Sequence, residues 1–180
     1  MMMQSISRSG WYARKEVQKV TQDWLKMNRH PTEREIELLK LIHERKLVSR
    51  NHLEVISPSY RYAGKYRANI LNNSIKNLFT TMYIDKIHEK QVFGSGNKPC
   101  IVALDRAGSL FLGVPHRQRI SHEKVEVKGR EHVFRGLPNY FRHANGINQL
   151  EVDTILLCED SDLELVKWKH ELCQSFHFGN

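Results

Sequence analysis

The sequence predicts a mixed α+β chain in which helices come first and short strands follow. Apolar residues recur every three to four positions over about residues 11–28, 32–46 and 62–82, a spacing typical of helices that bury one face. Two extended stretches, 83–93 and 100–104, flank a loop that runs from Gly94 to Pro99 and has the residue types of a hairpin connection.

The first predicted helix covers about residues 11–28 and ends at the breaker Asn28-Arg29-His30-Pro31. The second begins after Thr32, because Thr32 and Glu35 have the spacing of a capping box, and it continues to about Lys46. No later segment has an obvious pattern for contacting the first helix. We therefore expect it to pack on the following domain or on a second copy of the chain.

A short helix should follow, with Ser49 as its N-cap, and should stop at Ser57-Pro58-Ser59. A long helix is then expected over about residues 62–82. With 3.6 residues per turn, one side of this helix carries Leu71, Ile75, Leu78 and Met82. The opposite side has no carboxylate and carries Lys65, Asn69, Asn72, Asn73, Lys76 and Thr80.

After the hairpin strands, Asp105 is placed to cap a short helix from Arg106 to Leu112, which Gly113 closes. The resulting order is helix, short helix, long helix, strand, loop, strand and closing helix, which is the order of a winged helix-turn-helix. We predict an N-terminal extension over 1–29, a winged-helix DNA-binding domain over 30–115, and a small α/β domain over 116–180 that is a candidate for dimerisation.

The C-terminal part has fewer signals. Residues 124–128 alternate between charged residues and valine, as in a strand, and residues 137–158 contain enough apolar residues for one or two helices. An acidic turn is expected at 159–162, and a further strand at 163–168.

Charge is distributed unevenly along the chain, whose net charge is +8. Residues 1–115 hold 19 Lys and Arg against 10 Asp and Glu, whereas residues 116–180 hold 9 against 10. The whole basic excess therefore lies in the N-terminal part. A cationic module joined to a near-neutral one indicates a polyanion-binding domain followed by a domain with another task.

The long helix is the predicted recognition helix, because the second helix of a helix-turn-helix enters the major groove. Asn pairs bidentately with adenine, and Lys donates to guanine or to phosphate. The short helix, the approach to the long helix and the wing should add phosphate contacts. The predicted DNA-binding residues are Arg50, Asn51, Arg61, Tyr62, Lys65, Asn69, Asn72, Asn73, Lys76, Lys86, Lys90 and Lys98.

Two motifs contain part of a metal-binding pattern. His170, Cys173 and His177 share one helical face, but zinc needs a fourth ligand that the sequence does not supply. Glu126-Val127-Lys128 matches part of a nuclease motif that also needs an upstream Asp, usually after Pro, and no Pro-Asp pair occurs. We therefore predict no metal, no cofactor and no enzymatic activity.

The location of the protein follows from three observations. Three cysteines without a CxxC pair indicate reduced thiols, at least two of them buried. No run of 18 apolar residues occurs, so no membrane span is predicted. The N-terminus lacks the apolar stretch of a signal peptide. We expect a cytoplasmic protein without a membrane partner.

Several stretches together resemble the replication-relaxation proteins of bacterial plasmids and related mobile elements. They are Thr32–Ile42, Leu71–Ile84, Ile101–Leu112, Phe141–Asn148 and Val166–Glu171, in that order. The resemblance covers about residues 30–175. It implies a DNA-binding winged helix that serves plasmid replication, mobilisation or their transcriptional control. Longer members of that family continue into an endonuclease-like segment.

Three functions are thus open. The leading hypothesis is a sequence-specific, double-stranded DNA-binding protein, expected to be a homodimer, that acts as a transcriptional regulator or as a plasmid replication or mobilisation factor. The first alternative is a metal-dependent nuclease or nicking accessory that uses the C-terminal half and Glu126. The second is a protein-binding adaptor, for which a plot of DNA affinity against log[salt] would have a slope near zero.

Overall fold

The computed structural model describes residues 19–87, 99–116, 123–127, 130–134, 141–161, 163 and 165–169. Its architecture is mixed α+β, as the sequence predicts, with mostly helices, a small antiparallel sheet of three strands and a separate sheet of two strands. The elements along the chain are α1 (Gln22–Met27), α2 (Glu33–Arg45), β1 (Val48–Ser49), α3 (Arg50–Ile56), α4 (Pro58–Arg61), the 3₁₀ turn η1 (Gly64–Tyr66), α5 (Arg67–Thr80), β2 (Ile84–Ile87), β3 (Ile101–Leu104), α6 (Arg106–Leu112), β4 (Glu123–Val127), β5 (Arg130–Phe134) and α7 (Phe141–Asp160).

The three-stranded sheet has the order β1-β3-β2, and both strand pairs are antiparallel. Val48 of β1 pairs with Val102 of β3, and the amide of Arg50 donates to the carbonyl of Cys100 at 2.8 Å just beyond this pair. The sequence predicted no strand between the helix that ends near Lys46 and the N-cap at Ser49. Two residues are too few to show the alternation by which a strand is recognised, so β1 was missed.

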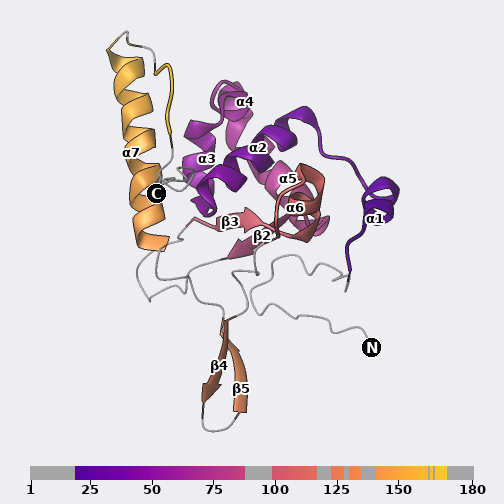
Figure 1. The fold of residues 1–180 in the computed structure, drawn as a ribbon. Helices are drawn as coiled ribbons and strands as arrows, with labels where there is room; N and C mark the ends of the chain where they lie inside the picture. Colours follow the sequence, from indigo (N-terminus) through magenta and orange to yellow (C-terminus); the bar gives the residue numbers. More distant parts are fainter. Residues whose placement is uncertain are drawn as a thin grey trace, which may run out of the picture.

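The main hydrophobic core lies where α2, α3 and α5 pack over the sheet, as Figure 1 shows. The predicted apolar stripe is confirmed for Leu71, Ile75 and Leu78, which α5 buries. Met82 is also buried, but it lies beyond the end of α5, at φ 60°. All four pack in one cluster with residues of the other elements, among them Leu38, Leu39, Ile42, Leu53, Tyr60, Tyr83 and Val102.

The predicted helix caps are present. The Thr32 hydroxyl accepts from the amide of Glu35, whose carboxylate accepts from the amide of Thr32 at 2.8 Å, so the capping box is confirmed. The Ser49 hydroxyl accepts from the amide of His52, and the Asp105 carboxylate accepts from the next amide. Gly113 closes α6 in the left-handed conformation, with φ at 68°.

Two predicted helix starts are wrong. Residues 19–21 are not helical, because the Thr21 side chain caps α1 and the helix begins at Gln22; residues 11–18 lie outside the described part. The long helix begins at Arg67, not at residue 62. Pro58 starts the additional helix α4, where its missing N–H is tolerated, and Gly64, at φ +70°, turns the chain before α5.

The C-terminal predictions had mixed outcomes. Residues 137–158 were expected to form one or two helices, and the single helix α7 is found. The strand at 124–128 corresponds to β4, which pairs with the unpredicted β5. No strand is present among the described residues of 163–168, which lie against α7 through Leu165.

Helix α7 packs against α3 and β1. Its Glu151 forms a buried ion pair with Arg45 of α2, and its Asn148 amide donates to the carbonyl of Leu47 at 2.9 Å. Val152 and Ile155 contact Ile56 in a small second cluster. Helix α7 is therefore attached to helices of residues 30–115, while the predicted domain boundary near residue 115 stays a prediction.

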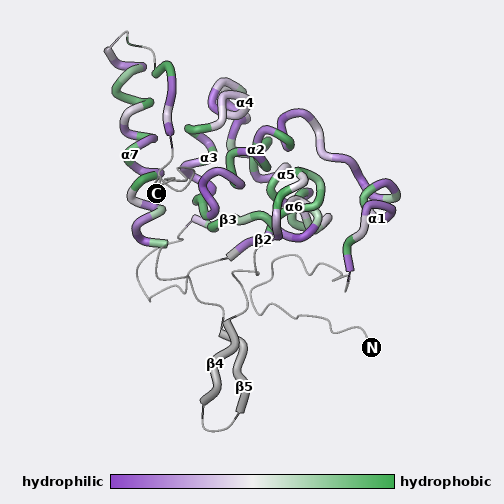
Figure 2. Tube along the Cα trace, viewed as in Figure 1, coloured by the Kyte–Doolittle hydropathy of each residue, from purple (hydrophilic) through white to green (hydrophobic). Residues whose placement is uncertain are grey.

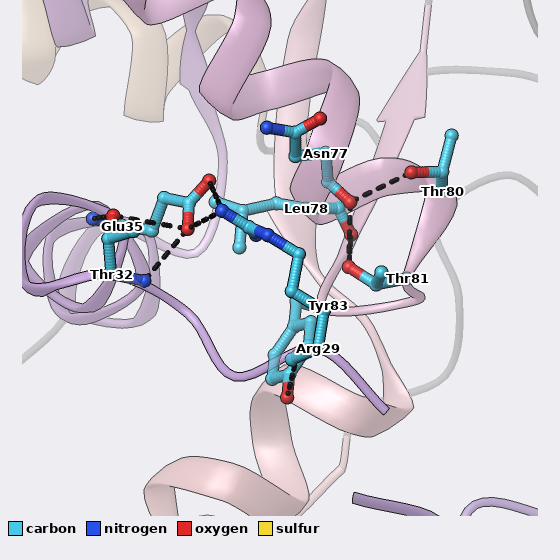
Figure 3. Close-up of polar contacts among 8 residues, drawn as sticks. All are labelled: Arg29, Thr32, Glu35, Asn77, Leu78, Thr80, Thr81 and Tyr83. Carbon is cyan, nitrogen blue, oxygen red and sulfur yellow. Dashed lines mark hydrogen bonds and ion pairs between the residues drawn. The ribbon is translucent and has the colours of Figure 1, made fainter. Parts of the chain in front are cut away.

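The linker between α1 and α2 is held at two points (Figure 3). The Arg29 guanidinium bonds both carboxylate oxygens of Glu35, at 3.0 and 2.8 Å, so Glu35 serves the helix cap and the linker together. The Arg29 carbonyl accepts from the Tyr83 hydroxyl at 3.2 Å. On the other side, Leu25 of α1 is buried in the main core. The first helix therefore packs on the domain, one of the two outcomes that the sequence allowed.

Candidate nucleic-acid interface

The exposed face of α5 is rich in neutral amides. Asn69, Asn72, Asn73 and Lys76 are exposed, while Leu71, Ile75 and Leu78 on the other side are buried. Helix α5 contains no carboxylate, and its only charged residues are Arg67 and Lys76. The sequence-based assignment of faces is therefore confirmed for these residues, and the face presents donors and acceptors of the kind that read base edges.

Lys65 does not share this helix. It lies in η1, one turn before α5, where it is exposed and its ammonium stands 5.0 Å from the centre of the Tyr66 ring. The helical wheel that placed Lys65 beside Asn69 assumed a helix from residue 62, and the turn at Gly64 makes that assumption wrong. Lys65 is still near the N-terminus of α5. The direction of its side chain depends on the turn η1, because Lys65 does not belong to the helix.

Arg50 and Asn51 lie at the start of α3. Arg50 is mostly buried, with 17% of its side chain exposed, and its guanidinium forms an ion pair with Glu54 in the next helical turn. Its Nε donates to Asn72 Oδ1 at 3.0 Å and its Nη1 to Asn51 Oδ1 at 3.2 Å. Arg50 was predicted to contact phosphate; in the structure it links α3 to α5.

Arg61 and Tyr62 lie where α4 meets the end of α7. Arg61 Nε is 3.4 Å from Glu159 Oε1, and the Tyr62 hydroxyl donates to the same oxygen at 3.4 Å. The Arg61 guanidinium also stacks 4.6 Å from the centre of the Tyr62 ring. The structure thus places these two predicted residues together, at the junction of α4 with α7.

Of the predicted wing lysines, only Lys86 is among the described residues; Lys90 and Lys98 lie outside them. Lys86 is in β2, half-buried, and its ammonium stands 5.0 Å from the centre of the Phe79 ring. Nearby, burial raises the pKa of the Cys100 thiol, although Lys86 and Arg50 act in the opposite direction. Cys100 and Cys158 are free and half-buried, and Cys173 lies outside the described part.

Two residues next to the α5 face were not predicted from the sequence. Arg67 opens α5, is about half exposed, and donates from Nε to Glu54 Oε1 at 2.9 Å. Tyr66 precedes it and is 59% exposed. The basic residues within 61–67 could have indicated these two residues as candidates for DNA contact. Because the predicted long helix began near residue 62, Arg67 was not recognised as a residue of its first turn.

The motifs considered for metal chemistry gain no support from the described residues. None of these residues forms a group of three or more His, Cys, Asp or Glu side chains suited to a metal. Glu126 lies in β4 opposite Glu131 of β5. Lys128 and the His170, Cys173 and His177 set lie outside the described part.

Comparisons of the chain with protein-family models, with curated proteins and with solved structures found no match. The resemblance to replication-relaxation proteins therefore stays a prediction. Among the described helices, none is long and apolar enough to cross a membrane.

Proposed function

We propose that the chain is a sequence-specific, double-stranded DNA-binding protein built on a winged helix-turn-helix, with α5 as its recognition helix. The element order α2, β1, α3, α5, β2, β3 and the sheet order β1-β3-β2 support this proposal, since a winged helix has this arrangement. β1, the strand absent from the sequence-based prediction, supplies the third strand of that sheet.

The observation that carries the proposal is the exposed face of α5. Three exposed asparagines and one lysine on a helix without carboxylates suit a major groove, where Asn pairs with adenine and Lys with guanine or phosphate. The basic excess of residues 1–115 adds a sequence-independent attraction to phosphate. A plain solvated helix face more often carries mixed charges.

The biological role is proposed from the family resemblance. We propose a transcriptional regulator, or a replication or mobilisation factor, of a plasmid or related mobile element. Both roles need the same binding step, so the first experiment concerns DNA binding itself.

The test begins with selection of bound duplexes from a randomised DNA pool. The triple variant Asn69→Ala, Asn73→Ala, Lys76→Ala should then bind the selected duplex at least about 100-fold more weakly, because removing one base-reading side chain costs about 1–3 kcal/mol. Lys40→Ala, at an exposed position of α2, is the matched control and should retain affinity. Equal binding by the triple variant and the wild type would exclude α5 as the reading element.

We further propose a homodimer formed by α7. Besides its buried face, this helix has a second apolar stripe at heptad spacing, made of Ile147, Leu150 and Leu157. Leu150 and Leu157 are 58% and 64% exposed, and Thr154 fills the intervening position. Figure 2 shows apolar and polar segments alternating along α7.

A second copy is the occupant that the charges of α7 favour. Arg142 lies in the first turn and Asp160 in the last, and both are exposed. Antiparallel pairing of two α7 helices brings the basic end of each against the acidic end of the other and also opposes their dipoles. Two copies related by a twofold axis would bind a palindromic site.

Sedimentation equilibrium tests this interface. The wild type should be dimeric at micromolar concentration, and Leu150→Glu with Leu157→Glu should be monomeric with an unchanged circular dichroism spectrum. Val166→Glu, at an apolar position that is 89% exposed but lies beyond α7, is the control and should stay dimeric. A monomeric wild type, or a dimeric double variant, would contradict the assignment.

A further inference from the structure

A half-buried carboxylate lies beside the start of α5. Glu54 of α3, with 15% of its side chain exposed, is held between two arginines. Arg50 contacts its Oε2, and the Nε of Arg67 donates to its Oε1 at 2.9 Å. Both guanidinium groups are therefore turned toward Glu54. This ion pair also fixes the direction of the Arg50 side chain.

Arg50 in turn fixes one asparagine of the α5 face. Its Nε donates to the side chain of Asn72 at 3.0 Å, and its Nη2 lies 3.4 Å from the carbonyl of Ala68 in the preceding turn of α5. A guanidinium can only donate, so the Asn72 atom that faces it must be the oxygen. The usual ambiguity between amide oxygen and nitrogen is thereby removed.

The consequence is a difference between neighbouring asparagines. Asn72 is exposed, and because its oxygen is turned toward Arg50, the amide nitrogen with its two N–H donors is the group turned away from Arg50. Among the described residues, Asn69 and Asn73 form no side-chain hydrogen bond and keep both donor and acceptor available. Bidentate recognition of adenine needs both, because adenine presents the N7 acceptor beside the N6 donor.

We propose that Arg50 orients Asn72 so that its amide donors, and not its oxygen, face the major groove and select guanine, whose N7 and O6 are both acceptors there. Asn69 and Asn73 read adenine on the same helix. Arg50 is a positioning residue in this scheme and Asn72 is the specificity-determining one. The inference rests on the proposed DNA-binding function and assigns a base preference to one position of its site.

The test uses the charge-neutral double variant Arg50→Met, Glu54→Gln. It removes the donor to Asn72 and the carboxylate of Glu54 together, so the net charge of the chain is unchanged. Binding is measured against the selected duplex and against duplexes in which each position is changed in turn. The wild type should prefer guanine over adenine at one position on the order of ten-fold. In the double variant this preference should be lost or reversed in favour of adenine there, with the other positions unchanged.

Asn72→Ala provides a second measurement that does not depend on the double variant folding. It should abolish the guanine preference at that same position, whereas Asn73→Ala should abolish an adenine preference elsewhere. A guanine preference that survives in Asn72→Ala, or in a folded double variant, would overturn the inference. Failure of the wild type to select any sequence would instead remove the proposed function, so the two failures are distinguishable.

Discussion

Replacing Glu151 with alanine should destabilise the protein by about 3 to 5 kcal/mol, because it leaves the Arg45 guanidinium buried without its main counter-ion. Arg45 and Glu151 have only 5% and 4% of their side chains exposed. They are joined by two hydrogen bonds, one of them from Arg45 Nε to Glu151 Oε2 at 2.9 Å.

The surroundings of Arg45 place the cost near the lower end of this range. After the substitution, its Nη1 still has the carbonyl of Leu41 at 3.3 Å and the carboxylate of Glu44 at 3.2 Å. Glu44 is 53% exposed, so water screens its attraction and it replaces only part of the missing ion pair. A loss of about 3 kcal/mol is a large share of the roughly 5 to 15 kcal/mol that holds a typical domain folded.

Equilibrium unfolding in urea, followed by circular dichroism, measures the change. Glu44→Ala is the matched control, since it removes the other, exposed carboxylate that contacts Arg45. It should lower the free energy of unfolding by less than about 1 kcal/mol. The paired change Arg45→Met, Glu151→Leu should restore most of the stability, because it leaves no buried charge. An equal cost for Glu151→Ala and Glu44→Ala would refute the assignment of a buried ion pair between α2 and α7.

Three further outcomes are expected. Gly108→Ala should destabilise the protein by about 1 to 3 kcal/mol, because the added Cβ would stand 2.1 Å from the carbonyl oxygen of Tyr83. Gly146→Ala in α7 should stabilise it by about 0.5 to 1 kcal/mol, because the added Cβ meets no atom within 4 Å. Thermal unfolding compares the two variants, and equal shifts of the melting temperature would contradict this packing. Burial lowers the pKa of His52 in the folded protein below its ordinary 6.5, so protonation favours the unfolded chain. The free energy of unfolding should therefore fall as the pH drops below about 6.5 and should level off below the folded pKa. In urea titrations at pH 7.5 and 5.5, His52→Gln should show a smaller difference between the two pH values. Thr32→Ala, which removes the capping box of α2, should cost about 1 kcal/mol in the same urea assay, and an unchanged midpoint would show that the cap is dispensable.

The sequence predicted well those features that depend on nearby residues. Thr32, Ser49 and Asp105 cap helices where expected, because a cap needs only a polar side chain and the amides that follow it. The buried stripe of Leu71, Ile75 and Leu78 was found because a long helix repeats its period several times. The polar face of α5 followed from the same periodicity.

The features that the sequence did not reveal depend on residues far apart in the chain. The contacts of Arg50 with Asn72 and of Arg61 with Glu159 could not be predicted, because tertiary packing brings these residues together. Strand β1 exists because β3 lies beside it, and two residues have no period of their own. The early start assigned to the long helix had a local cause, since one glycine at positive φ outweighed a continuous helical pattern.

Because Arg29 anchors the linker after α1, the stability of α1 depends on the elements to which Arg29 is attached. A helix of six residues has too few internal hydrogen bonds to persist alone in water, so α1 depends on Leu25 in the core and on the two attachments of Arg29. Those attachments end on α2, through Glu35, and on Tyr83 just before β2. Loosening of either element would therefore release α1, and hydrogen exchange at the α1 amides would report on the opening of α2 or of the chain at Tyr83.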